Sequence, residues 1–513
     1  GNVNGEWEQG ASAYEKRGTA VMVPEWDAEK CIQCNQCAFV CSHATIRPFC
    51  LTADEAANAP ESTKLADTKP KASEYKFTMA VSPLDCMGCG ECVTVCPTKA
   101  IEMKPQESQA AQQAAFDYCV ENIRKKDNIP GVVSDISVKG SQFNQPLLEF
   151  SGSCAGCAET SYARLITQLF GEKMFISNAT GCSSIWGGTA SISPYTTNKE
   201  SGFGPAWINS LFEDNAEHGL GMQIGYETVR ANLITKVEAL KGKNADLDAV
   251  IDKYLETKNN TKANDAPAKA LIAALEACGC DESKEILKDK QYLAKKSFWI
   301  FGGDGWAYDI GYGGLDHVLA SGHDVNVMVF DTEMYSNTGG QASKASNIGE
   351  VCQFAAAGKE ISKKSLSEIA MTYGYIYVAQ IALGANMNQA VKAIAEAEAY
   401  PGPSLIIGYA PCELHGVKGG MTNCQNEMKK AVEAGYWNLF TFNPALKAEG
   451  KNPFTLTSKA GKMDKYQEFL ANETRYSRLS RAFPDRAKAL FDKNQEAAEA
   501  RYTHLTKLVD LYK

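Results

Sequence analysis

CIQCNQCAFVC at residues 31–41 and CMGCGECVTVCP at residues 86–97 repeat one spacing of cysteines, and this repeat decides the fold around it. In each run, two residues separate the first three cysteines, so one short loop can supply three thiolates to an iron–sulfur cubane. The fourth cysteine follows three residues further on and binds the other cluster. The pattern predicts two 4Fe–4S clusters, one held by Cys31, Cys34, Cys37 and Cys96 and the other by Cys86, Cys89, Cys92 and Cys41.

Zinc is the alternative, because C-x-x-C pairs also occur in zinc sites. A zinc site needs four ligands and gives no reason for a doubled three-plus-one spacing, so the cluster interpretation is preferred. Ser42 stands where such runs usually have proline, and all four ligands remain intact. The two runs resemble a bacterial two-cluster ferredoxin. We expect a small α+β domain of this type at residues 26–126, preceded by a linker at residues 1–25.

Composition and charge set further limits. A length of 513 residues suggests about three domains, and an apolar fraction of 44% is ample for large cores. A net charge of −9 without a dense basic stripe argues against nucleic-acid binding, and no apolar run is long enough to span a membrane. Reduced thiolates that bind iron indicate a reducing compartment, so we expect a cytoplasmic protein. The chain starts at Gly1 rather than Met, which indicates a processed product or a piece of a longer protein.

Residues 127–440 show the alternation of short apolar runs and longer amphipathic segments that is typical of a parallel α/β domain. The charged, Ala- and Lys-rich stretch at about 227–292 predicts a helical insertion, and residues 441–513 predict a C-terminal arm. Short lysine pairs such as Lys363–Lys364 are expected on solvated helix faces. The predicted strands are Phe298–Phe301, Val325–Phe330, Ile376–Ile381 and Ser404–Tyr409.

A cofactor site is predicted where two of these strands end. The strand FWIF leads into Gly302, Gly303, Asp304 and Gly305, and glycines at a strand-to-helix turn let a backbone approach a phosphate closely. Asp304 would repel a phosphate unless a cation such as Mg²⁺ lies between them. The next strand ends at Asp331, and the carboxyl ends of parallel strands face one crevice. A glycine-rich structural turn is the alternative.

The strings GDGWAYDIGYGGLDH (303–317) and DTEMYSNTGGQ (331–341) resemble the pyrophosphate-binding domain of the pyruvate:ferredoxin oxidoreductase family. This resemblance implies thiamine diphosphate, with Mg²⁺ held by the Asp304 carboxylate, the Thr332 hydroxyl and the Met334 carbonyl. Thr332 replaces the asparagine of the general thiamine motif, and Asn337 would face the thiazolium and substrate as the catalytic residue. The cofactor contacts that the resemblance implies are Glu159, Cys182, Gly303, Asp304, Gly305, Trp306, Thr332, Glu333, Met334, Tyr335, Ser336 and Asn337.

Four other cysteines occur in SGSCAGCAET (151–160), ATGCSSIWGG (179–188) and YAPCELHG (409–416), too far apart in sequence to be grouped by spacing. Buried free thiols are one alternative, and a zinc site that includes His415 is another. The same resemblance implies a third 4Fe–4S cluster on Cys154, Cys157, Cys182 and Cys412, with His415 outside it. The other cysteines are treated as structural or incidental.

The implied reaction is oxidative decarboxylation of pyruvate with coenzyme A, which gives acetyl-CoA and CO₂ and passes electrons through three clusters to ferredoxin or flavodoxin. Such chemistry belongs to anaerobic metabolism, and a homodimer is expected. No second α/β domain is present to contact the thiamine pyrimidine ring, so an N-terminal part or a partner chain is expected to supply it. Two alternatives stay open. One is a sister enzyme for 2-oxoglutarate, a branched 2-oxoacid or indolepyruvate, and the other is an electron-transfer adaptor with a vestigial thiamine fold.

Overall fold

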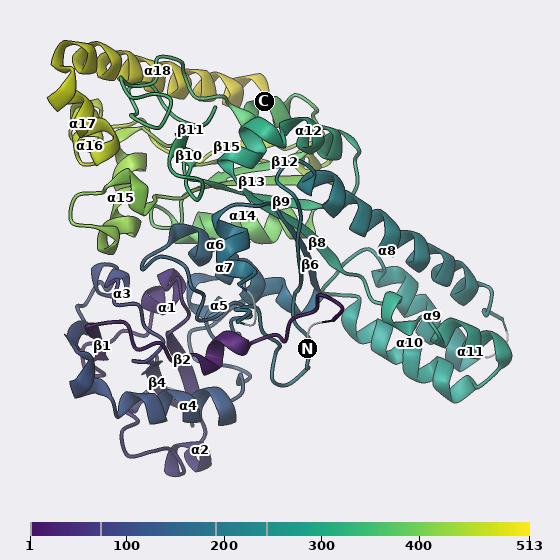
Figure 1. Cartoon of the computed structure of the whole chain (residues 1–513). Coiled ribbons are helices and arrows are strands. Elements are labelled where there is room, and N and C mark those ends of the chain that lie inside the picture. The colour runs from purple at the N-terminus through teal and green to yellow at the C-terminus, as the bar shows by residue number, and fades with distance from the viewer. Residues whose placement is uncertain (1–2, 72–73, 190–191, 243–244) are drawn as a thin grey trace.

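The structure is a computed structural model that describes residues 3–71, 74–189, 192–242 and 245–513, so small pieces of the predicted linker and insertion lie outside the described residues. A sheet of eight strands forms its centre, in the order β15-β14-β12-β13-β9-β8-β6-β7 (Figure 1). The six strands from β12 to β7 pair in parallel, whereas β14 and β15 are antiparallel. Their bounds are β6 Met174–Asn178, β7 Ala206–Asn209, β8 Ser297–Gly303, β9 Asn326–Asp331, β12 Tyr377–Ile381, β13 Ser404–Tyr409, β14 Phe440–Phe442 and β15 Phe454–Leu456.

The central strands are apolar on both sides because helices cover both faces of the sheet. Every residue of β9 and β13 is buried. Helix α14 (Met387–Ala399) packs on β12 and β13, and α6 (Ala158–Phe170) lies between the sheet and the small N-terminal domain (Figure 1). Helix α12 (Tyr312–Ala320) lies on the opposite side. The four strand predictions are confirmed, as is the parallel α/β class.

The N-terminal domain has the α+β character that the cysteine runs predict. Strands β1 (Met22–Trp26) and β5 (Ile101–Pro105) pair with each other, and each cysteine run contains a short helix. Helix α4 packs on β4, but the predicted helix over 105–126 is longer than the observed one, which begins at Gln112 after a 3₁₀ turn. The remaining elements are α1 Gln36–Val40, β2 Ile46–Leu51, α2 Ala53–Ala57, β3 Ala66–Asp67, β4 Lys76–Val81, α3 Glu91–Thr94 and α4 Gln112–Asn122.

One helix joins the sheet domain to the predicted insertion. Helix α8 (Asn215–Glu238) starts about a dozen residues before the predicted boundary and is about 36 Å long at the standard rise per residue. Its first half packs in the main core through Ala216 and Leu220, and its second half packs in a separate core through Leu233 and Val237. The helices that complete this second core are α9 Ala245–Thr257, α10 Asp265–Cys278 and α11 Asp281–Leu287.

The C-terminal segment packs against the main core. Helices α16 (Tyr466–Ala471), α17 (Thr474–Ala482) and α18 (Pro484–Leu511) contribute buried side chains to the core around the sheet, among them Tyr466 and Tyr476. Figure 1 shows these helices along the side of the sheet opposite the N-terminal domain. Among the described residues, none of the helices combines the length and the apolar character that crossing a membrane requires.

Candidate active site and cysteine clusters

Four adjacent parallel strands carry the site residues just beyond their carboxyl ends. Cys182 follows β6, Asp304 follows β8, Thr332 follows β9 and Cys412 follows β13. These strands are neighbours in the order β13-β9-β8-β6, with Asp331 of β9 opposite Tyr409 of β13. The carboxyl edge of a parallel sheet is where ligands bind in this class of fold. The topology thus brings segments that are distant in sequence to one edge.

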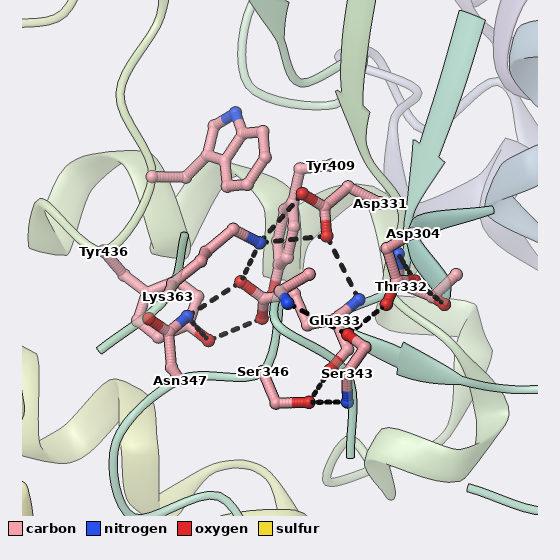
Figure 2. Close-up of polar contacts among 12 residues, drawn as sticks. Asp304, Asp331, Thr332, Glu333, Ser343, Ser346, Asn347, Lys363, Tyr409 and Tyr436 are labelled. Atoms are coloured by element: carbon pink, nitrogen blue, oxygen red, sulfur yellow. Dashed lines mark hydrogen bonds and ion pairs between the residues drawn. The ribbon is translucent and has the colours of Figure 1, made fainter. Parts of the chain in front are cut away.

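Asp304 and Thr332 meet at this edge (Figure 2). The Thr332 hydroxyl lies 2.9 Å from Asp304 Oδ1 and 3.0 Å from the Met334 carbonyl oxygen. The Thr332 backbone N–H and the Ser343 hydroxyl also donate to the Asp304 carboxylate. Burial and the neighbouring Asp331 carboxylate raise the pKa of Asp304 well above its usual value, so an ionised Asp304 needs a cation nearby.

The three oxygens predicted to bind Mg²⁺ fit that ion. Octahedral Mg²⁺ has metal–oxygen distances near 2.1 Å, which places adjacent ligand oxygens about 3 Å apart. The hydroxyl of Thr332 has this separation from both the Asp304 carboxylate and the Met334 carbonyl. A carboxylate, a hydroxyl and a carbonyl are also the oxygen donors that a hard cation prefers.

Two glycines of the predicted turn are required by close packing. A Cβ atom at Gly302 would lie 2.4 Å from the Trp306 ring, and one at Gly305 would lie 2.5 Å from the Tyr335 ring. Trp306 is fully buried, whereas Tyr335 is partly exposed. The turn therefore brings Gly305, Trp306 and Tyr335 into one packed group beside Asp304, and Gly303 at the end of β8 lies opposite Phe330.

Ser336 and Asn337 lie in the turn between two short strands, β10 (Met334–Tyr335) and β11 (Gln341–Ala342). The Ser336 hydroxyl donates to the Thr332 hydroxyl at 2.8 Å. Asn337 is exposed in this turn, so its catalytic contact with thiazolium and substrate stays a prediction.

Glu333 has a different environment from the other predicted contacts (Figure 2). Its backbone is in the left-handed region, with φ at 61°, and its carboxylate points into a buried ionic network. Lys363 Nζ and Arg475 Nη1 lie 3.1 and 2.9 Å from its two oxygens, and Asn347 and Tyr436 donate to them. Burial alone would raise the pKa of Glu333, but the two cations lower it to about 2. The Glu333 carboxylate is thus held by protein groups, and only its backbone remains for the predicted cofactor contact.

The sequence prediction for Lys363 was wrong. Lys363 is not on a solvated helix face; its side chain is only 11% exposed and bridges Asp331 and Glu333. Arg475 of α17 also has no signal in the sequence, although it is buried against Glu333, Glu350 and Glu473. Nothing in the local pattern around either residue indicates a partner so distant in sequence.

The two cysteine sets of the N-terminal domain are brought together as predicted. We call them the first quartet (Cys31, Cys34, Cys37 and Cys96) and the second quartet (Cys41, Cys86, Cys89 and Cys92). The Cys37 thiol is in electrostatic contact with the other three members of the first quartet, and one small cavity is lined by all four. Cys92 has the same relation to the other members of the second quartet. Burial raises the pKa of Cys86 to about 11, so iron would have to displace the thiol proton.

The third quartet consists of Cys154, Cys157, Cys182 and Cys412. Cys157 precedes α6, Cys182 starts α7 (Cys182–Gly187), and the Cys182 thiol is in electrostatic contact with the other three. Throughout residues 3–71, 74–189, 192–242 and 245–513, no three Cys, His, Asp or Glu side chains converge closely enough to hold one metal ion. A 4Fe–4S cubane binds four thiolates through four separate irons, and each of the three quartets supplies four cysteines.

His415 lies outside the third quartet. Its Nε2 donates to the Thr332 carbonyl at 2.7 Å, and its Nδ1 accepts from the Cys412 backbone N–H at 3.4 Å. Burial and the nearby Arg475 lower the pKa of His415 to about 3, so the ring is neutral. Both ring nitrogens are therefore engaged, which leaves neither for a zinc ion.

Glu159 lies beside the third quartet. Its carboxylate accepts from the Trp186 indole N–H at 3.1 Å, and burial raises its pKa to about 7. The same carboxylate is in electrostatic contact with Cys157 and Cys182. Its contact with thiamine stays a prediction.

The second and third quartets lie next to each other. Gly156, between Cys154 and Cys157, lies against Met421 and Glu91, and a Cβ atom there would be 3.3 Å from the Glu91 carboxylate. The Thr422 hydroxyl donates to the Cys89 carbonyl at 2.5 Å. The Cys92 thiol of the second quartet is in electrostatic contact with Cys37 of the first. The first quartet lies next to Ile32, which is 49% exposed.

Comparison with known families agrees with these sites. Residues 30–100 match the model of a 4Fe-4S dicluster domain, and residues 287–407 match that of the thiamine pyrophosphate enzyme, C-terminal TPP binding domain. The chain is thus an iron–sulfur protein with a thiamine diphosphate-binding domain. In sequence it corresponds to the C-terminal part of pyruvate:ferredoxin and pyruvate-flavodoxin oxidoreductases.

Two relatives show the extent of this similarity. The pyruvate-flavodoxin oxidoreductase of Enterobacter agglomerans and the pyruvate:ferredoxin oxidoreductase of Moorella thermoacetica are each 50% identical over 99% of this chain. The chain spans 44% of the length of either relative. A solved 2-oxoglutarate:ferredoxin oxidoreductase from Magnetococcus marinus aligns with 51% of this chain and 64% of its own, at 15% identity and a TM-score of 0.31, which adds nothing to the fold described above.

Proposed function

We propose that this chain supplies the thiamine diphosphate site and the electron relay of an enzyme that converts pyruvate and coenzyme A to acetyl-CoA and CO₂. The observation that carries the proposal is the position of the third quartet beside the Asp304–Thr332 site, on neighbouring strands of one sheet. Electrons released at the cofactor would need only a short path to the first cluster. The substrate is taken from the relatives, which are named for pyruvate.

Each proposed ligand has a defined task. Asp304, Thr332 and Met334 would hold Mg²⁺, which would neutralise the diphosphate against the buried Asp304 carboxylate. Thiamine diphosphate, when bound, supplies the electron sink for decarboxylation. The Lys363–Glu333–Arg475 network fixes the loop that presents Thr332 and Met334.

We propose that electrons flow from the third quartet through the second quartet to the first. The third quartet is nearest the cofactor site, the second is adjacent to it through Glu91 and Met421, and the first lies next to exposed Ile32. Ferredoxin or flavodoxin would collect electrons near the first quartet, one at a time.

We propose a cytoplasmic homodimer in which an N-terminal part or a partner chain contacts the pyrimidine ring and completes the substrate pocket. Within this chain, we propose domains at residues 26–126 and 127–440.

The test is coenzyme A-dependent dye reduction by the complete anaerobic assembly, with pyruvate compared against 2-oxoglutarate, branched 2-oxoacids and indolepyruvate. Pyruvate should give the highest kcat/KM. A preference for another 2-oxoacid would favour the sister-enzyme alternative. The adaptor alternative predicts no thiamine diphosphate binding, which calorimetry with Mg²⁺ and the cofactor would detect.

Asp304→Asn is the matching variant for the cofactor site. The asparagine side chain has the size of the aspartate and can still accept a hydrogen bond from Thr332. The substitution removes the only charged ligand proposed for Mg²⁺. Thiamine diphosphate affinity should fall by roughly tenfold to a hundredfold or more, while the visible absorbance of the clusters stays normal. Unchanged affinity would mean that this turn does not hold the cation.

A further inference from the structure

Two residues connect the proposed Mg²⁺ site with the third quartet, and both connections run between Thr332 and Cys412. The first is Ser336. Its hydroxyl donates to Thr332 Oγ1 at 2.8 Å. Burial raises the pKa of the Cys412 thiol to about 11, and the nearby Ser336 hydroxyl opposes this rise. Ser336 therefore lies beside both a proposed ligand of the cation and a proposed ligand of the cluster.

The second connection is His415, which links the backbones of the same two residues. Nε2 donates to the Thr332 carbonyl at 2.7 Å, and Nδ1 accepts from the Cys412 N–H at 3.4 Å. The ring is fully buried, and the His415 backbone N–H donates to the Cys412 carbonyl at 2.9 Å. A displacement of either loop would therefore strain the other.

The hydroxyl protons can be followed through this arrangement. Without a cation, Thr332 Oγ1 has the Asp304 carboxylate and the Met334 carbonyl as acceptors, and it accepts the Ser336 proton. A cation bound by those three oxygens would occupy their lone pairs. The Thr332 proton would then turn to Ser336 Oγ, and the Ser336 proton would turn to Cys412 Sγ. No proton is gained or lost, and only the direction of two hydrogen bonds changes.

We propose that Ser336 and His415 couple the cation–diphosphate site to the third cluster, so that binding of Mg²⁺–thiamine diphosphate and reduction of this cluster favour each other. The inference rests on the proposed function. A hydrogen bond donated to a cluster sulfur stabilises the reduced, more negative state and raises the reduction potential. By reciprocity, the reduced cluster binds the cofactor more tightly by the same factor. A tenfold tighter affinity corresponds to 59 mV for one electron.

A redox titration of the third cluster tests the coupling, with electron paramagnetic resonance as the readout. It is carried out on the complete enzyme without substrate, once with and once without Mg²⁺–thiamine diphosphate. The parent protein should show a higher potential with the cofactor. Ser336→Ala should lose most of this rise. The control is Ser367→Ala, a buried serine of α13 (Leu366–Met371) that bonds to Gln380 far from Cys412 in sequence, and it should retain the full rise. A full rise in Ser336→Ala, or no rise in the parent protein, would overturn the role of Ser336.

Two substitutions separate the contribution of His415 from simple packing. His415→Gln can place an amide N–H near the former Nε2 and should keep much of the coupling. His415→Phe fills the space without a donor or acceptor and should reduce it. Equal coupling in both variants would exclude His415. Failure of the proposed function can be distinguished from failure of the coupling. If the proposed function is wrong, the parent protein binds no cofactor in calorimetry or lacks the signal of the third cluster altogether.

Discussion

Arg475 Nη1 lies 2.9 Å from Glu333 Oε2, and this ion pair connects helix α17 of the C-terminal segment with the loop that carries Thr332 and Met334. Both side chains are almost fully buried, at 1% and 0% exposure. The same guanidinium also contacts Glu350 and Glu473, so one cation serves three buried carboxylates. The C-terminal segment thereby becomes part of the support for the cofactor site.

Replacing Arg475 by Ala should destabilise the protein strongly. The substitution leaves buried carboxylates without their counter-charge, which typically costs about 3–5 kcal/mol. Scanning calorimetry of the anaerobic protein should show a clear decrease in Tm, and thiamine diphosphate affinity should fall because the Glu333 loop loses its support. The control is Arg486→Ala, which removes an exposed pair with Glu360 and should cost about 0–1 kcal/mol. Equal Tm values for the two variants would refute the importance of the buried network.

Cys182→Ala should remove the third cluster alone. Three quartets predict about twelve iron atoms per chain, four for each cluster, and the variant should retain about eight. Iron and sulfide analysis gives the count, and electron paramagnetic resonance should still show the pair of clusters in the N-terminal domain. A parent protein with about eight irons would remove the third cluster, whereas loss of every signal in the variant would indicate misfolding.

Gly305→Ala should weaken cofactor binding. A Cβ atom there would lie 2.5 Å from the Tyr335 ring, and overpacking of this kind typically costs about 1–3 kcal/mol. The control is Gly313→Ala in α12, where a Cβ atom would meet nothing within 4 Å and helix propensity would improve. Calorimetric titration with Mg²⁺–thiamine diphosphate should show reduced affinity for the first variant and normal affinity for the second. Normal affinity in both would mean that Gly305 tolerates a side chain.

Glu398 of α14 should make stability depend on pH. Burial raises its pKa from 4.5 to about 7, against an opposing effect of the Thr261 hydroxyl; Asp324 adds to the rise, and Lys295 opposes it weakly. Between these two values the folded state keeps a proton that the unfolded state has released, so stability falls as pH rises. The loss is at most about 3 kcal/mol. Glu398→Gln should flatten the Tm profile between about pH 4.5 and 7 relative to the parent protein, and parallel profiles would contradict the prediction.

Cys34→Ala tests the order of the relay. The variant lacks a ligand of the first quartet, which we propose as the last cluster of the relay, so pyruvate-dependent reduction of the third cluster should proceed at the parent rate. Reduction of ferredoxin should slow sharply, because the acceptor would lose its nearest donor. Freeze-quench spectroscopy separates the two steps. Normal ferredoxin reduction by a variant with that cluster confirmed absent would place the cluster outside the path.

Much of the fold was predictable because its signals are local in sequence. The cysteine runs at 31–41 and 86–97 predict two clusters by spacing alone, and the structure brings the thiols of each quartet together. The apolar runs before Asp304 and Asp331 predicted β8 and β9, since buried parallel strands are almost wholly apolar. The bounds of the helical insertion at about 227–292 stay a prediction. Helix α8 continues without a break from one core into the other, and the second core contains side chains from Val229 to Ala294.

The tertiary structure decided how distant segments meet. Cys182 and Cys412 come together because β6, β8, β9 and β13 are neighbours in the sheet, and strand order is not encoded in any single segment. Lys363 and Arg475 look like ordinary surface residues in the sequence, yet they neutralise Asp331 and Glu333 in the interior. Sequence patterns record which face of a segment is apolar and which ligands are close along the chain. Long-range packing decides which partner a buried charge has, because a charged side chain leaves water only when the core assembles around it.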